Sequence, residues 1–153
     1  MGIVEKLRAG VTTCCAAETQ ALAAEFATAL PPDTTLALHG DLGVGKTTFV
    51  QGLARGLGLT DAVTSPTFNI FTLHRGPTNL VHLDAYRLES AREVDDLLLA
   101  DFLVSPWCLA VEWPEKIAGW LPVATLHLDL GIGPHERHTV SLRPQPRPAP
   151  PAR

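Results

Sequence analysis

Hydrophobic residues recur every three or four positions in three segments of the chain, the spacing that places side chains on one face of an α-helix. The first segment stops at Pro31-Pro32, which cannot continue a helix. The pattern therefore predicts three amphipathic helices, each with an inward hydrophobic face. They cover residues 18–30 with Leu22, Phe26 and Leu30 inward, 46–57 with Phe49, Leu53 and Leu57 inward, and 91–104 with Val94, Leu98 and Phe102 inward.

Short runs of hydrophobic and β-branched residues lie between these helices and predict β-strands. Turn residues at 76–77 and at 131–134 each separate two runs, so two hairpins are expected. Residues 107–111 follow a helix without polar alternation, which is typical of a buried parallel strand. The predicted fold class is α/β, a three-layer fold with a mainly parallel central sheet, antiparallel hairpin strands and flanking helices. The predicted strands cover residues 11–15, 34–39, 68–73, 80–84, 107–111, 125–130 and 139–142.

The chain of 153 residues is expected to form one domain over residues 1–142. Residues 143–153 are rich in proline and are expected to form a disordered tail. No run is long and apolar enough for a bilayer, and the N-terminus lacks an apolar signal region, so we expect a cytoplasmic protein. The three cysteines fit neither a disulfide framework nor a zinc site, and we interpret them as buried reduced thiols. They are Cys14, Cys15 and Cys108.

The charge of the chain argues against tight binding to nucleic acid by this protein alone. The formal net charge is −4, and no run of lysine or arginine exists to follow a phosphate backbone. If the protein acts on nucleic acid, we expect a partner to hold it.

Residues 40–47 carry the strongest chemical signal, a glycine followed by four residues and then Gly-Lys-Thr. The segment lies between a predicted strand and a predicted helix, which is the context of a phosphate-binding loop (P-loop) and of the P-loop NTPase-like fold. Its amides would surround an anion, Lys46 would reach the β- and γ-phosphates, and Thr47 would ligate Mg²⁺. We expect Lys46 to face solvent until phosphate binds. No Asn-Lys-x-Asp motif is present, which favours ATP over GTP.

A phosphate loop of this kind needs a second metal ligand, usually an acid at the end of a neighbouring strand. Glu112 ends the run 108–112, and Asp84 ends the run 80–84. We favour Glu112 near the metal because its run is the cleaner buried parallel strand. Asp84 would then orient the attacking water or lie in the outer shell of the metal. Either acid has an alternative role as a strand-end residue that caps the next turn.

Three further residues have open roles. Thr67 follows a proline downstream of the loop and is either a switch residue that senses the γ-phosphate or an ordinary turn residue. Arg87 either neutralises charge in the transition state or forms a surface salt bridge. Trp113 is either a core residue or an exposed aromatic side chain available to nucleotide or partner.

Taken together, four segments resemble the TsaE (YjeE) family of bacterial P-loop ATPases. The matching segments are residues 40–48, Ser65-Pro66-Thr67-Phe68, His82-Leu83-Asp84-Ala85-Tyr86-Arg87-Leu88, and Val111-Glu112-Trp113. The resemblance implies a slow, partner-stimulated, Mg²⁺-dependent ATPase that acts with TsaD and TsaB subunits in forming threonylcarbamoyladenosine in tRNA. Contact with tRNA would be indirect, through the complex.

The resemblance also implies a set of site residues. It implies a hydrolytic or partner-sensing role for Asp84, Tyr86 and Arg87, and metal ligation by Thr47 and Glu112. It also implies a switch role for Ser65–Phe68, so the expected catalytic residues are Lys46, Thr67, Asp84 and Arg87. It implies closure of the first predicted helix over the base near residues 15–19. The expected nucleotide-binding residues are Gly40, Asp41, Gly43, Val44, Gly45, Lys46, Thr47, Thr48 and Arg137.

Two rival functions fit the loop alone. A small P-loop kinase would need a lid with arginines, and residues 114–124 offer only Lys116. A nucleotide-dependent switch module would bind without efficient hydrolysis, and a TsaE-like protein would share part of that behaviour until partners complete its site.

Overall fold

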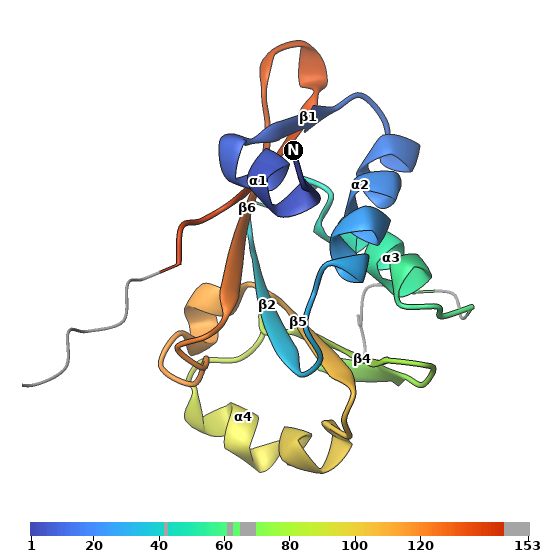
Figure 1. Ribbon diagram of the computed structural model, residues 1–153. Helices are drawn as coiled ribbons and strands as arrows, with labels where there is room; N and C mark the ends of the chain where they lie inside the picture. The colour runs from blue at the N-terminus through green and yellow to red at the C-terminus, as the bar shows by residue number, and fades with distance from the viewer. Residues whose placement is uncertain (42, 61–62, 65–69, 146–153) are drawn as a thin grey trace, which may run out of the picture.

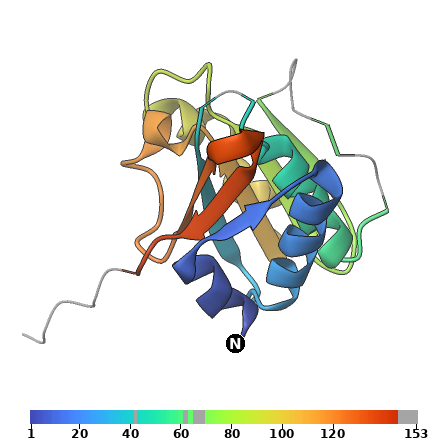
Figure 2. The ribbon, with the colours of Figure 1, turned by 90° about the horizontal axis from the view of Figure 1, so that it is seen from above.

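The computed structural model describes residues 1–41, 43–60, 63–64 and 70–145 and contains one seven-stranded sheet with helices on both faces (Figures 1 and 2). The strand order is β1-β7-β6-β2-β5-β4-β3. Most of the Pro-rich tail, from residue 146 onward, lies outside the described residues. The strands are β1 Val11–Thr13, β2 Thr34–His39, β3 Phe71–His74, β4 Asn79–Asp84, β5 Trp107–Glu112, β6 Leu126–Ile132 and β7 His138–Leu142.

The centre of the sheet is parallel and its edges are antiparallel. Strand β2 pairs in parallel with β5 and with β6, and β5 pairs in parallel with β4. The two expected hairpins are present as antiparallel β3–β4 and β6–β7. In this register Glu112 lies opposite Leu38 on one side and Asp84 on the other, so three strands end at one edge. The α/β fold class is confirmed.

Three α-helices cover one face of the sheet. Their buried side chains form one hydrophobic cluster with residues of β2, β6 and β7, and it includes Phe26, Phe49 and Leu53. Helices α2 and α3 pack side by side in Figures 1 and 2. The two predicted helices on this face agree with the structure to within two residues at each end. The three helices are α1 Ile3–Ala9, α2 Ala16–Thr28 and α3 Lys46–Gly56.

Helix α1 was not predicted. It has only seven residues, and it lies between Gly2 and Gly10, which cap its two ends. Ile3 and Leu7 are its two buried residues, one turn apart, and they join the cluster beneath α2 and α3. A single i, i+4 pair is too little periodicity to predict a helix from the pattern alone.

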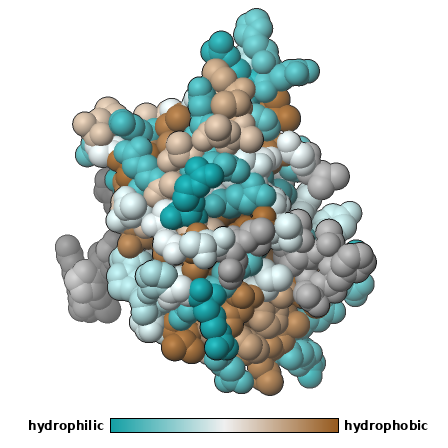
Figure 3. Space-filling model, turned by 90° about the vertical axis from the view of Figure 1, so that its right-hand side faces the viewer, coloured by the Kyte–Doolittle hydropathy of each residue, from teal (hydrophilic) through white to brown (hydrophobic). Residues whose placement is uncertain are grey.

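The opposite face is covered by shorter and less regular elements. A second hydrophobic cluster there includes Val81, Leu83, Leu109 and Val111 from β4 and β5. Figure 3 shows hydrophobic residues gathered at the lower end of the molecule, where α4 and η1 lie. These elements are α4 Arg92–Asp96 and the 3₁₀ helices η1 Leu99–Phe102 and η2 Pro114–Ile117. A third 3₁₀ helix, η3 Pro134–Glu136, lies in the turn between β6 and β7.

The prediction of one continuous helix over residues 91–104 is wrong. The segment breaks at Leu98, whose φ of +55° lies in the left-handed region. Leu98 is 63% exposed instead of facing inward, whereas Val94 is buried and Phe102 packs against the second cluster.

Within the described ranges, no helix has the length and apolar character needed to cross a membrane.

The interpretation of all three cysteines as buried is wrong for two of them. Cys14 and Cys15 are exposed at the start of α2, and only Cys108 is buried. Cys108 lies inside the sheet on β5, and burial raises the pKa of its thiol to about 12.

Candidate nucleotide-binding site

The predicted phosphate loop connects the end of β2 to the first turn of α3. Gly45 is the residue before the helix and has a φ of +98°, a left-handed conformation that glycine adopts without strain. Gly40 has a φ of +149°, and a Cβ there would lie 2.5 Å from the carbonyl oxygen of Leu130. Glycine is therefore required where the loop passes under β6. The N-terminus of α3 points its free amides into the loop, which favours an anion.

Lys46 is only 5% exposed, which corrects the expectation that it faces solvent. Its ammonium Nζ donates a hydrogen bond to the carbonyl oxygen of Gly40 at 2.6 Å. The same Nζ lies 3.7 Å from the ring centroid of Trp113, within the range of a cation–π contact. Burial lowers the pKa of Lys46, and the nearby carboxylates of Glu112 and Glu115 partly oppose that shift. The Gly40 carbonyl and the Trp113 ring are therefore partners of this charge within the protein.

Trp113 lies over the lysine and combines features of both alternatives, because it is partly buried against the core and also lines the cavity described below. It follows β5 with a φ of +56°, an unusual conformation for a tryptophan, and this turns the chain toward the loop. The ring packs against the second hydrophobic cluster and lies 5.1 Å from the ring of Tyr86. Tyr86 is 57% exposed and packs at a tilt on the outer side of Trp113, and its ring centroid lies 5.9 Å from the Nζ of Lys116.

A cavity of about 340 Å³ brings the main predicted residues together. Thr47 and Glu112 line the same cavity from two different elements, α3 and β5. A hydroxyl oxygen and a carboxylate oxygen are hard ligands of the kind Mg²⁺ prefers, so the donor set fits that ion. The cavity is lined by Gly43, Gly45, Lys46, Thr47, Thr48, Glu112 and Trp113.

Glu112 is buried at the end of β5, with 5% exposure. Its Oε2 lies 2.5 Å from Nε2 of His82, a side chain of β4 with no exposed surface. The side chain of Glu112 thus contacts a core histidine while also lining the cavity. The alternative role of Glu112 as a turn cap does not match this arrangement.

Asp84 lies one strand further from the loop and does not line the cavity. Its Oδ1 accepts a hydrogen bond from the backbone N–H of Tyr86 at 3.0 Å. This is the turn-capping contact that the sequence left as an alternative. It uses one carboxylate oxygen of Asp84.

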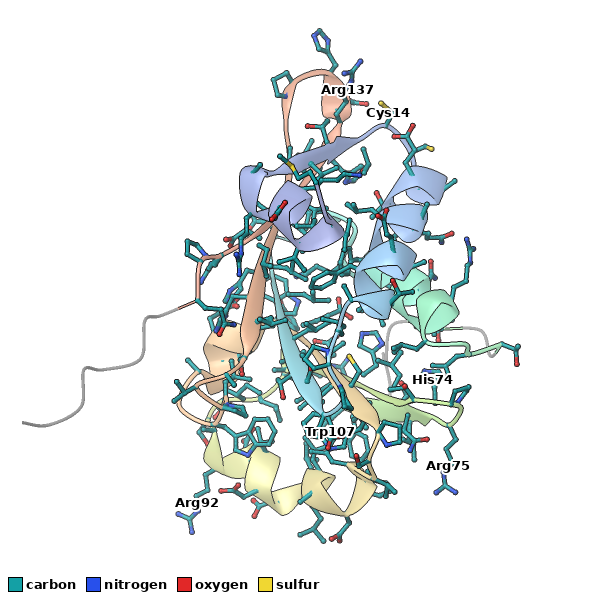
Figure 4. The ribbon with its side chains drawn as sticks, in the orientation of Figure 1. Cys14, His74, Arg75, Arg92, Trp107 and Arg137 are labelled. Atoms are coloured by element: carbon teal, nitrogen blue, oxygen red, sulfur yellow. The ribbon has the colours of Figure 1, made fainter. Side chains whose placement is uncertain are left out.

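The remaining predicted site residues are more scattered. Asp41, Arg87 and Arg137 are exposed and do not line the cavity, and Thr67 lies outside the described residues. Val44, which belongs to the loop, has a buried side chain. Figure 4 shows Arg137 at the β6–β7 hairpin, and the register of β1 against β7, with Thr13 opposite His138, brings Cys14 near it.

His138, the neighbour of Arg137, makes the contact between β7 and the loop. Its Nδ1 lies 3.0 Å from the carbonyl oxygen of Val44. Sequence reasoning missed both this histidine and His82. His82 stands inside an otherwise apolar run and begins one of the segments that resemble the family, but no role was assigned to it, whereas nothing in the local sequence distinguishes His138.

The strand–loop–helix unit, the parallel centre of the sheet and the lined cavity define a P-loop NTPase-like protein. The sequence model of the family described as Threonylcarbamoyl adenosine biosynthesis protein TsaE matches residues 13–139. The chain belongs to this family, and the resemblance seen in its motifs is confirmed.

Curated relatives and a solved structure agree with that assignment. The protein named tRNA threonylcarbamoyladenosine biosynthesis protein TsaE in Bacillus subtilis is 42% identical over 112 residues, covering 72% of this chain and 70% of the relative. The protein of the same name in Treponema pallidum is 36% identical over 103 residues, covering 67% and 76%. The crystal structure of Bacillus subtilis YdiB superimposes with a TM-score of 0.73 at 31% identity, covering 87% of this chain and 82% of that one.

Proposed function

We propose that this protein is a Mg²⁺-dependent ATPase of the cytoplasm that supports formation of threonylcarbamoyladenosine in tRNA together with TsaD- and TsaB-like subunits. The observation that carries the proposal is the shared cavity, in which Lys46, Thr47 and Glu112 converge at the N-terminus of α3. The names of the relatives supply the pathway.

In this proposal the amides of residues 43–48 bind the phosphates of ATP, and Lys46 changes partners. Its ammonium leaves the Gly40 carbonyl and the Trp113 ring and hydrogen-bonds to phosphate oxygens instead. Thr47 and Glu112 would hold Mg²⁺, which when bound neutralises charge on the phosphates. The loop and its lysine would therefore both take part in recognising the triphosphate.

Hydrolysis is expected to be slow in the isolated protein. Asp84 lies at the same sheet edge and keeps one carboxylate oxygen for orienting a water molecule. Arg87 is exposed and does not line the cavity, and we assign it a role that depends on a partner. Thr67 is assigned the role of a switch residue that senses the γ-phosphate. A cation supplied in trans raises the rate of phosphoryl transfer by ~10³–10⁵ in related chemistry.

Calorimetric titration with a non-hydrolysable ATP analogue and Mg²⁺ tests the site. Lys46→Ala should weaken binding about 10–100-fold, because charged hydrogen bonds are worth about 1.5–3 kcal/mol. Lys116→Ala is the matched control, since the Nζ of Lys116 lies 5.9 Å from the ring centroid of Tyr86 and Lys116 does not line the cavity. The affinity of this variant should stay within about twofold of the parent. Equal affinities for Lys46→Ala and the parent would contradict the nucleotide site. Thermal unfolding of both variants checks the fold, because Lys46 is buried.

The partner assignment has its own test. A pull-down from native cytoplasm, with and without the same analogue, should recover TsaD- and TsaB-like subunits, and adding them should raise ATP turnover. Recovery of neither subunit under both conditions would contradict this part of the proposal while leaving the nucleotide site intact.

A further inference from the structure

A fully buried histidine lies in the middle of strand β4. His82 has no exposed surface, and its neighbours on the strand are hydrophobic residues of the two core clusters. In the parallel register it lies opposite Ala110 of β5, two residues before Glu112. Ala110 leaves room for the imidazole to extend along β5 toward the carboxylate.

The two ring nitrogens of His82 differ in their hydrogen bonding. Nε2 lies 2.5 Å from Oε2 of Glu112, whereas Nδ1 has no hydrogen-bond partner in the part of the chain that the structure describes. The arrangement is satisfied when the proton is on Nε2 and is donated to the carboxylate. A buried polar side chain that leaves one of its two nitrogens unpaired is a poor choice for packing alone. Its one hydrogen bond goes to a residue that lines the nucleotide cavity.

We propose that His82 is a positioning residue for Glu112. Its hydrogen bond to Oε2 fixes the direction of the carboxylate and leaves the other oxygen for the cavity shared with Thr47. This inference rests on the proposed function, in which Glu112 is a ligand of Mg²⁺. Residues that orient a metal ligand in this way typically contribute about 10–100-fold to metal affinity or activity.

The test measures metal binding without hydrolysis. Mn²⁺ is titrated into the protein·ADP complex and followed by electron paramagnetic resonance, and ADP affinity is measured separately in EDTA. His82→Leu should weaken Mn²⁺ binding about 10–100-fold. The affinity for metal-free ADP should stay within about threefold, because the amides and Lys46 are untouched.

Two amide variants of His82 test whether its hydrogen bond to Glu112, and not only its volume, supports metal binding. Glutamine places its amide nitrogen close to the position of Nε2, so His82→Gln should restore Mn²⁺ affinity to within about threefold of the parent. Asparagine places its nitrogen near the position of Nδ1, so His82→Asn should behave like the leucine variant. If His82→Leu does not fold, the difference between these two amide variants decides the question.

Leu80→Ala is the matched structural control, because Leu80 is fully buried and lies two residues earlier on the same strand. It should lower stability without changing Mn²⁺ affinity. An equal loss of Mn²⁺ affinity in Leu80→Ala and His82→Leu would overturn the proposal.

Glu112→Gln separates failure of this inference from failure of the proposed function. If Glu112→Gln loses Mn²⁺ affinity and His82→Leu does not, the positioning role is overturned and the metal assignment stands. If neither variant loses affinity, both are overturned.

Discussion

The two faces of the sheet differ in how they are covered, and the nucleotide site lies where they meet. One face carries the three α-helices α1, α2 and α3 over a continuous hydrophobic cluster. The other carries the short α4, η1 and η2, with left-handed residues at Leu98 and Trp113. The regular face places the loop and Lys46, and the irregular face supplies Trp113, which covers that lysine. The helical face and the irregular face thus contribute different residues to one site.

The irregular face is also divided along the sheet. Over β4 and β5 it is hydrophobic, whereas over the end of β2 and over β6 it carries the polar residues His39, His127 and Asp129. There the rings of His39 and His127 stack, and Asp129 binds Arg143 through two hydrogen bonds. Stability should therefore depend on hydrophobic burial in one region and on charge and pH in the other.

The largest expected effect compares two phenylalanines. Phe49 has no exposed surface and packs near Phe26, whereas Phe102 is only partly buried and packs against Phe71. Phe49→Ala should lower the free energy of unfolding by about 3–5 kcal/mol. Phe102→Ala should cost about 1–2 kcal/mol, since less apolar surface is lost. Urea unfolding measures both, and equal costs would mean that the two faces are equally well packed.

The same difference explains which elements the sequence predicts well. Residues 46–56 carry one clear stripe of hydrophobic positions, so the helix and its buried face follow from spacing alone. Residues 97–99 are three consecutive leucines, which fit a helical stripe in several phases. The pattern therefore does not show that the chain turns left-handed at Leu98 and exposes that side chain.

The residues of the site also differ in how well the sequence predicts them. The loop residues are contiguous, so a motif finds them, and Glu112 follows from the rule that acids end buried strands next to such a loop. His82 and Trp113 contribute through contacts between strands and through a backbone angle at the end of β5. Such contacts depend on the register of β4 against β5, which the local hydrophobic pattern of each strand does not reveal by itself.

The next effect is a dependence on pH in the polar region. His39 and His127 share a hydrogen bond of 2.8 Å between Nε2 and Nδ1, and burial together with Arg143 lowers the pKa of both rings. For His39, the carboxylates of Asp129 and Glu115 partly oppose that shift. As the pH falls, the two rings therefore bind protons in the unfolded chain at a higher pH than in the folded protein. The free energy of unfolding should fall as the pH drops below the ordinary pKa of 6.5. Protonation of both rings also removes their hydrogen bond, worth about 0.5–1.5 kcal/mol.

Urea unfolding between pH 7.5 and pH 5 measures this dependence. His127→Gln should flatten the decline, because it removes one of the two titrating rings. His135→Gln is the control, since His135 is exposed in η3, and it should leave the profile unchanged. A decline of the same slope in His127→Gln and the parent would place the pH dependence elsewhere.

A smaller effect tests the break in the irregular face. Leu98 is exposed and left-handed, a conformation that costs a leucine about 1–2 kcal/mol and that asparagine tolerates. Leu98→Asn should therefore raise the free energy of unfolding by about 0.5–1 kcal/mol. Thermal unfolding measures the change. If residues 91–104 instead formed one helix with Leu98 inward, the same substitution would destabilise the protein by several kcal/mol.

The smallest effect concerns the ion pair of the polar region. The hydrogen bonds from Arg143 lower the pKa of Asp129, so the pair stabilises the protein above the unfolded value of 3.8, and that contribution is lost as the pH falls further. Both side chains are nearly half exposed, so Asp129→Asn should cost only about 0.2–1 kcal/mol at pH 7. The cost should shrink in 1 M salt and below pH 3.8, because both conditions weaken the charge pair in the parent. A cost that stays constant under both conditions would show that Asp129 acts through packing, and the contrast between a hydrophobic and a charge-dependent half of this face would not hold.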